Sequence, residues 1–195
     1  IKHKKRKMIK ELFNILISIF RLNKDFFVNK KNFDQASIYF AILLILIGAI
    51  ISIIPNSSFL IYMSSKFDLG VIQGPSLRFV IITSILMWFI KTTYLFFVGT
   101  ILFPSKKTKC NFRKLLILVA YCQVPLFLNA LILTPGFLLL AFITYTWYNV
   151  SLIIGLKIFL NYDSYIKTTF VSLAPQIIFF LFILSSFQKN TIALS

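Results

Sequence analysis

The sequence predicts an all-α membrane protein, a polytopic bundle of five transmembrane helices preceded by an amphipathic helix at the membrane interface. Of its 195 residues, 58% are hydrophobic and only 13% are charged, whereas an ordinary soluble domain has about 25% charged residues. The apolar residues are concentrated in runs of roughly twenty, the length that crosses a hydrocarbon core. Most of the apolar surface is therefore expected to face lipid.

Five apolar runs are separated by turn-forming or charged segments, and each is assigned one span. Pro55-Asn56 is expected to end the first run, Pro104 the second and Thr134-Pro135-Gly136 the third, because proline and glycine interrupt helices. Pro175 lies inside the fifth run and is expected to kink it. The expected spans, within a transmembrane domain of residues 36–188, are approximately Ser37–Ile54, Arg78–Phe103, Leu115–Leu133, Phe137–Leu160 and Thr168–Phe187.

The segment between the first two spans contains prolines, glycines and polar residues, so it is expected to be an external loop. Within it, Phe59–Met63 either continues the first helix or lies at the membrane interface. Ser105–Lys114 is expected to be a basic loop, with the third span starting after it.

Residues 1–35 are expected to form a cytoplasmic segment made of a basic tail and an amphipathic helix. Apolar residues recur at helical spacing from Ile9 to Phe20, and polar residues fall mostly on the other face. This helix is too short and too charged at its ends to span. It is expected to lie in the inner headgroup layer, with the basic tail on anionic lipid headgroups. The alternative is a helix packed on the cytoplasmic end of the bundle.

The positive charges predict the orientation. The net charge is +16, with ten Lys and Arg side chains in residues 1–31 and five at positions 106, 107, 109, 113 and 114. Cytoplasmic segments carry the Lys and Arg excess, so the N-terminus and residues 161–167 are expected inside and the tail 189–195 outside. These cations adjoin apolar runs, so no nucleic-acid partner is expected. The predicted location is the cell membrane of a prokaryote or the endomembrane of a eukaryote.

Residues that carry chemistry are scarce. None of the five acidic residues falls inside a predicted span, the one histidine is His3, and the two cysteines, Cys110 and Cys122, lie in different environments. No catalytic motif, metal-ligand spacing or disulfide framework is present. The sequence therefore predicts no enzyme, no cofactor and no metal.

Lys91 is the one charged residue deep inside a predicted span. Intramembrane charges are costly and by default mark functional sites. Gln123, Asn129 and Asn149 are expected at a similar depth, so the four form a candidate polar cluster. The alternative is that Lys91 snorkels toward the headgroups. The aromatic residues near the middle of span four are interpreted as packing residues.

Three segments resemble the five-span Ypt-interacting protein (Yip) domain family, over roughly Phe26–Leu184. They are the lead-in Asp25-Phe26-Phe27, the stretch Asn111–Pro125 (NFRKLLILVAYCQVP) and the stretch Ile166–Pro175 (IKTTFVSLAP). The resemblance implies an N-cytoplasmic bundle and makes Tyr121 and Pro125 family-motif positions. Ala120 replaces the usual glycine, and the Asp-Leu-Tyr-Gly-Pro motif of the trafficking members is absent before span one. The resemblance is therefore to the prokaryotic-type branch.

Three functions remain open from the sequence. The first is a non-enzymatic scaffold or partner in membrane organisation or trafficking, as the resemblance implies, with protein partners in the membrane. The second is a small transporter or permease component that uses the polar cluster around Lys91. The third is an accessory subunit of a large membrane complex.

Overall fold

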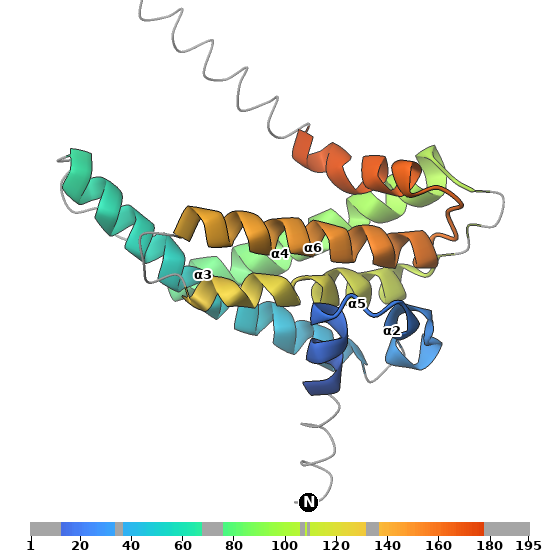
Figure 1. The fold of residues 1–195 in the computed structure, drawn as a ribbon, viewed down its shortest axis with the longest axis horizontal. Coiled ribbons are helices and arrows are strands. Elements are labelled where there is room, and N and C mark those ends of the chain that lie inside the picture. Colours follow the sequence, from blue (N-terminus) through green and yellow to red (C-terminus); the bar gives the residue numbers. More distant parts are fainter. Residues whose placement is uncertain are drawn as a thin grey trace, which may run out of the picture.

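A computed structural model describes residues 13–33, 37–67, 76–105, 108, 110–131 and 137–177. Within these ranges the chain is helical and has no strand, as Figure 1 shows, so the all-α class is confirmed. A helix over residues 13–20 comes first. It is followed by α2 (Lys24–Val28), the 3-10 helix η1 (Lys30–Phe33), α3 (Ser37–Phe67), α4 (Leu77–Phe97), the π-helix η2 (Val98–Leu102), α5 (Phe112–Cys122), the 3-10 helix η3 (Val124–Leu131), α6 (Phe137–Phe159) and a helix over residues 165–177.

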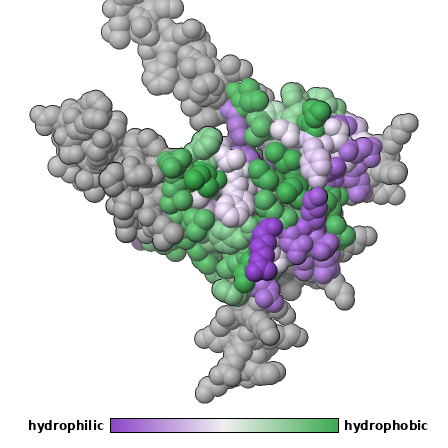
Figure 2. Space-filling view, viewed as in Figure 1, coloured by the Kyte–Doolittle hydropathy of each residue, from purple (hydrophilic) through white to green (hydrophobic). Residues whose placement is uncertain are grey.

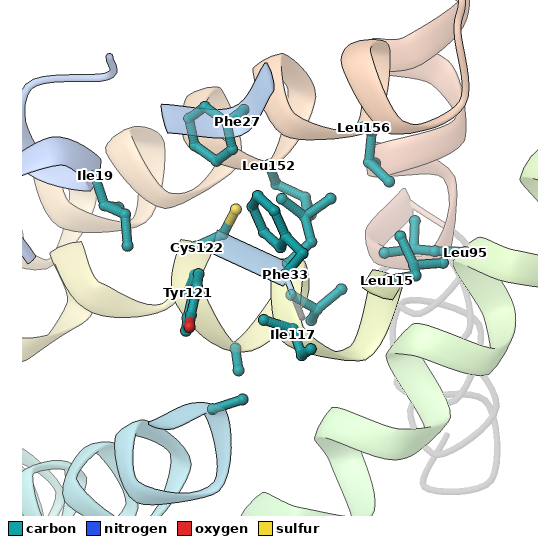
Figure 3. Packing of buried hydrophobic residues seen from close by; sticks show 14 of the residues in the cluster. Ile19, Phe27, Phe33, Leu95, Leu115, Ile117, Tyr121, Cys122, Leu152 and Leu156 are labelled. Atoms are coloured by element: carbon teal, nitrogen blue, oxygen red, sulfur yellow. The ribbon is translucent and has the colours of Figure 1, made fainter. Parts of the chain in front are cut away.

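The short helix α5 forms the centre of the bundle. It packs against α3, α4 and α6, and every residue from Ile117 to Cys122 is fully buried. Figure 3 shows its side chains surrounded by buried residues of other elements, among them Leu95 of α4, Leu152 and Leu156 of α6, and Ile19, Phe27 and Phe33 of the N-terminal segment. The core is therefore built around the stretch that carries the family-like motif.

Capping and proline explain where α5 begins and ends. The Asn111 carboxamide oxygen accepts the Arg113 backbone N–H at 2.9 Å, an N-cap bond that starts the helix. The third span thus begins at Phe112, three residues earlier than the expected Leu115. Pro125 has no N–H to donate to the Tyr121 carbonyl, so the α-helix ends at Cys122 and the chain continues as η3.

The expectation that Pro55 ends the first helix is wrong. Helix α3 continues through this proline to Phe67, for 31 residues in total. A proline removes one backbone hydrogen bond and kinks a helix, but transmembrane helices tolerate it where the freed carbonyl finds another donor. The stretch Phe59–Met63 is accordingly part of a helix, which was one of the two alternatives for it.

Three helices are long and apolar enough to cross a membrane, counted over the described residues: Leu77–Leu102, Phe112–Asn129 and Leu139–Phe159. A shorter apolar helix covers Ile38–Ile53. The second and fourth predicted spans, Arg78–Phe103 and Phe137–Leu160, therefore coincide closely with helices. The fifth run is helical from residue 165 to 177, and the rest of it lies outside the described residues, as does the tail 189–195.

The N-terminal segment packs on the flank of the bundle. Ile19 is fully buried, and the Phe20 ring meets the Trp147 ring of α6 edge to face, with centroids 5.8 Å apart. Further along, α2 contacts α6 and η1 contacts α5. In Figure 1 the helix of residues 13–20 lies across the bundle helices instead of parallel to them. Its position in a membrane interface stays a prediction.

Candidate functional site

Lys91, near the middle of α4, points into the bundle. Its Nζ lies 4.4 Å from the centroid of the Tyr148 ring of α6, and the Cys122 side chain of α5 is within electrostatic range. The face of an aromatic ring attracts a cation, more strongly where water is excluded. The ring of Tyr148 is therefore a direct partner of the ammonium group.

Asn149 and Asn129 form two further contacts, each between helices. The Asn149 Oδ1 accepts a hydrogen bond from Gln176 Nε2 at 2.9 Å, which joins α6 to the helix of residues 165–177. The Thr144 hydroxyl donates to Asn129 Oδ1 at 2.6 Å, which joins α6 to η3. Such bonds satisfy polar groups inside a membrane bundle and hold its helices in register.

Gln123 faces a different neighbour. Its Oε1 lies beside Gly48 of α3, 3.9 Å from where a Cβ on that glycine would stand. Of the four candidate residues, Lys91 forms a cation–π pair. The other three each lie at a different contact between helices. The contacts described for these four residues are thus with different partners, and their grouping in one polar cluster stays a prediction.

Tyr121, the first family-motif position, is fully buried at the centre of the bundle. Its ring centroid is 5.9 Å from that of Phe26 and 5.8 Å from that of Phe33, so it is the surface on which the N-terminal segment rests. Pro125, the second position, ends α5 one turn later. Both motif residues act on packing and backbone geometry.

A group of hydrogen bonds closes one end of the bundle, which we call the basic end and define as residues 103–114 and 160–167. The Tyr162 hydroxyl bonds the carbonyls of Gly99 at 2.7 Å and Phe103 at 2.8 Å. The Thr108 hydroxyl donates to the Leu160 carbonyl at 3.0 Å, and Lys167 Nζ donates to the Pro104 carbonyl at 2.9 Å. These bonds tie the segment after α4 to the segment after α6.

Burial keeps two ionisable groups of the basic end, Cys110 and Tyr162, in their protonated forms at neutral pH. Burial raises the pKa of Cys110 to about 11. Burial, with a smaller effect of Cys110, raises the pKa of Tyr162 to about 12. At neutral pH, Cys110 and Tyr162 therefore do not supply a thiolate or phenolate nucleophile. No group of three or more His, Cys, Asp or Glu side chains that could hold a metal occurs among the described residues.

The family model for the Yip1 domain matches residues 17–187, which is most of the chain and includes every contact described above. The chain belongs to the Yip1 domain family. This family is non-enzymatic, in agreement with the prediction from the scarcity of catalytic side chains. No curated protein and no solved structure matches the chain.

Sequence reasoning missed three residues that matter in this Yip1 domain. Tyr148 was interpreted as packing, yet its ring receives Lys91. Gln176 lies one residue after Pro175 and is the partner of Asn149. Tyr162 sits in a loop, where a tyrosine gives no periodic signal, and only the tertiary structure reveals its two carbonyl partners.

Replacing Tyr162 with phenylalanine is expected to destabilise the Yip1 domain by about 1–3 kcal/mol, because the carbonyls of Gly99 and Phe103 lose the one hydroxyl proton that they share. Thermal unfolding in mild detergent measures this change. Tyr165→Phe is the matched control, since Tyr165 is exposed and its ring still receives Lys157, which lies 3.6 Å from its centroid. Equal melting temperatures for the two variants would contradict the role of Tyr162.

Proposed function

We propose that this Yip1-domain protein is a membrane scaffold that binds other membrane proteins in membrane organisation or trafficking. The observation that supports this proposal is that polar side chains inside the bundle form hydrogen bonds between helices. Asn149 bonds Gln176, and Asn129 bonds Thr144, in each case between two helices. These side chains therefore hold the helices together instead of lining a reaction site. A bundle of this kind acts through its surface.

We further propose that the protein has five spans, a cytoplasmic N-terminus and a membership in the prokaryotic-type branch. The positions of the ordered segments support the orientation. Residues of α2 and η1 lie near the start of α5 and the end of α6, so the N-terminal segment and the start of α5, with Lys114, belong to the same end of the bundle. Cytoplasmic segments carry such an excess of cations.

Copurification tests the scaffold role. The full chain, cross-linked in its native membrane and isolated in mild detergent, is expected to carry other integral membrane proteins, which mass spectrometry identifies. A fixed stoichiometry with one large assembly would favour the accessory-subunit form of the proposal. Recovery of the chain without any cross-linked membrane protein, at a cross-linker dose that captures known neighbours in the same membrane, would contradict it.

A small transporter is the second candidate, and one observation favours it: Lys91 faces the bundle interior and not the lipid. A transport path requires water to reach this side chain. Lys91→Cys, in a chain with Cys110→Ser and Cys122→Ala, would then react with a hydrophilic thiol reagent from at least one side of the membrane. The scaffold proposal expects no reaction, because the ring of Tyr148 covers the position.

Lys91→Leu gives a second, independent measure. A lysine at mid-membrane costs about 2.5–3.5 kcal/mol on insertion scales, so the scaffold proposal expects the leucine variant to keep or gain thermal stability. Lys157→Leu is the matched control, because it removes a similar cation–π pair, with Tyr165, in the last turn of α6. A loss of stability confined to Lys91→Leu would show that the bundle depends on the cation.

A further inference from the structure

A cavity of about 580 Å³ lies at the basic end, between the N-terminal segment and the ends of α5 and α6. Its walls come from three parts of the chain that are far apart in sequence: α2 with η1, the start of α5, and the end of α6 with the residues after it. Cavities of this size accommodate small molecules or parts of larger ones. The N-terminal segment thus creates a space that the transmembrane helices alone would leave open.

One wall of this cavity is apolar and aromatic. Phe27, Phe33 and Phe159 line it, and the rings of Phe33 and Phe159 meet edge to face with centroids 4.6 Å apart. Phe27 and Phe33 are almost fully buried, so packing fixes their positions before any ligand arrives. A hydrocarbon chain is the natural neighbour of such a wall.

Another part of the lining is polar and positively charged. It carries Asn111, Lys114 and Asn161. Lys114 stands in the first turn of α5, where the helix start adds partial positive charge. Nothing in the described part of the chain pairs with its ammonium group, and none of the residues that line the cavity is acidic. This wall favours an anionic group.

The cavity also lies at the end of the spans, where the hydrocarbon chains of a bilayer meet its anionic headgroups. Apolar spans start at Phe112 and end at Phe159, and the chain outside them is basic. In Figure 2 hydrophilic residues gather mainly toward this end of the bundle, and hydrophobic residues cover the rest of the face shown. Phospholipids carry their phosphates at this depth, and basic pockets between transmembrane helices bind anionic headgroups.

We propose that this cavity binds one anionic phospholipid, with its phosphate on Lys114 and an acyl chain along the wall formed by Phe27, Phe33 and Phe159. The site is distinct from the basic tail of residues 1–7, which is expected to contact headgroups without selecting a single molecule. It is also independent of the scaffold role, since a bound lipid would serve either function.

Native mass spectrometry of the full chain in mild detergent tests the proposal, with phosphatidylglycerol and phosphatidylcholine as probes. One phosphatidylglycerol is expected to stay bound, and phosphatidylcholine is expected to bind more weakly. Lys114→Gln should weaken phosphatidylglycerol binding about fivefold, the effect of one basic side chain at a membrane surface. Lys24→Gln, the same change at an exposed residue of α2 that does not line the cavity, should leave binding unchanged.

Val28→Glu is a second variant that keeps the test decisive if Lys114→Gln folds poorly. Val28 lines the cavity but is 60% exposed, so a carboxylate there should repel the phosphate without disturbing the core. Bound phosphatidylglycerol should also slow the labelling of Cys110 by a maleimide at alkaline pH, where part of this thiol is ionised, because Cys110 lines the cavity and Cys122 is fully buried.

Three results would overturn the proposal. Equal weakening by Lys114→Gln and Lys24→Gln would mean that the lipid responds to general surface charge. Displacement by millimolar inorganic phosphate would mean that the cavity binds phosphate alone. Unchanged Cys110 labelling in the presence of bound phosphatidylglycerol would place the lipid elsewhere.

Discussion

Replacing Tyr121 with alanine is expected to destabilise the bundle by about 3 kcal/mol, the usual cost of removing a large buried aromatic side chain. Tyr121 is fully buried at the centre of the fold, and its ring supports Phe26 and Phe33. The substitution removes the surface on which the N-terminal segment rests. Limited proteolysis of residues 13–33 should therefore become faster, in parallel with a lower melting temperature in detergent.

Tyr121→Phe is the control, because it keeps the ring and its contacts with Phe26 and Phe33. It is expected to retain most of the stability and the slow proteolysis. If alanine and phenylalanine behave alike, the ring is not the support of the N-terminal segment. If alanine lowers the melting temperature but leaves proteolysis unchanged, the segment is held by other contacts, such as Phe20 on Trp147.

Replacing Gly155 with valine is expected to destabilise the contact between α5 and α6 by about 1–3 kcal/mol, as overpacking does in a close-packed core. A Cβ at Gly155 would stand 2.6 Å from Leu118 Cδ1 and 3.3 Å from Leu118 Cγ. Leu118 is fully buried, so its side chain has little room to move away. Small residues at such crossings allow transmembrane helices to approach closely.

Leu118→Ala provides the test of the mechanism. Alone it should be destabilising, because it opens a cavity. Combined with Gly155→Val it should be less harmful than the sum of the two single effects, since valine then occupies the freed space; residues in contact commonly show coupling energies of about 0.5–3 kcal/mol. Additive effects in thermal unfolding would contradict the proposed contact. Gly155→Ala should show a smaller loss than valine.

The sequence predicted the second and fourth spans well because the bilayer constrains them. A run of about twenty apolar residues has few other structures available to it, and in the sequence Pro104 and Thr134-Pro135-Gly136 stand at the edges of these runs. The expected span Arg78–Phe103 and the observed Leu77–Leu102 differ by one residue at each end. Proline and glycine predicted the end of a helix correctly where the apolar run ended at the same place.

The same reasoning failed at Pro55, where the helix continues to Phe67. A proline is a strong breaker of isolated helices, but in a membrane bundle neighbouring groups can satisfy the carbonyl that it frees. The end of α5 shows the opposite case. There Pro125 does end the α-helix, and the apolar run continues as the 3-10 helix η3, so hydropathy alone gave no sign of the change.

The direction in which each polar side chain of the spans points could not be predicted from the sequence. Lys91, Gln123, Asn129 and Asn149 were expected at one level from their places along the spans. Their partners depend on the rotation of each helix about its axis. Apolar residues surround α4 on all sides, with Val80 and Leu95 buried and Ile82 and Met87 exposed, so no hydrophobic stripe indicates which face turns inward.

The N-terminal segment illustrates a related difficulty. Its helical periodicity was readable, but an apolar face can lie on lipid or on protein with the same pattern. The burial of Ile19 and the ring contacts of Phe20 and Phe26 reveal a protein neighbour. These contacts are formed with residues more than ninety positions away, and no local signal in the sequence identifies them.

The five-span, N-cytoplasmic arrangement is the central claim of this account, and thiol labelling of intact cells tests it most directly. In a chain with Cys110→Ser and Cys122→Ala, single cysteines replace Ser105 at the basic end and Ser195 at the C-terminus. A membrane-impermeant maleimide added outside is expected to label position 195 and to reach position 105 only after the membrane is opened. Protection of both positions, or labelling of position 105 from outside, would contradict the arrangement.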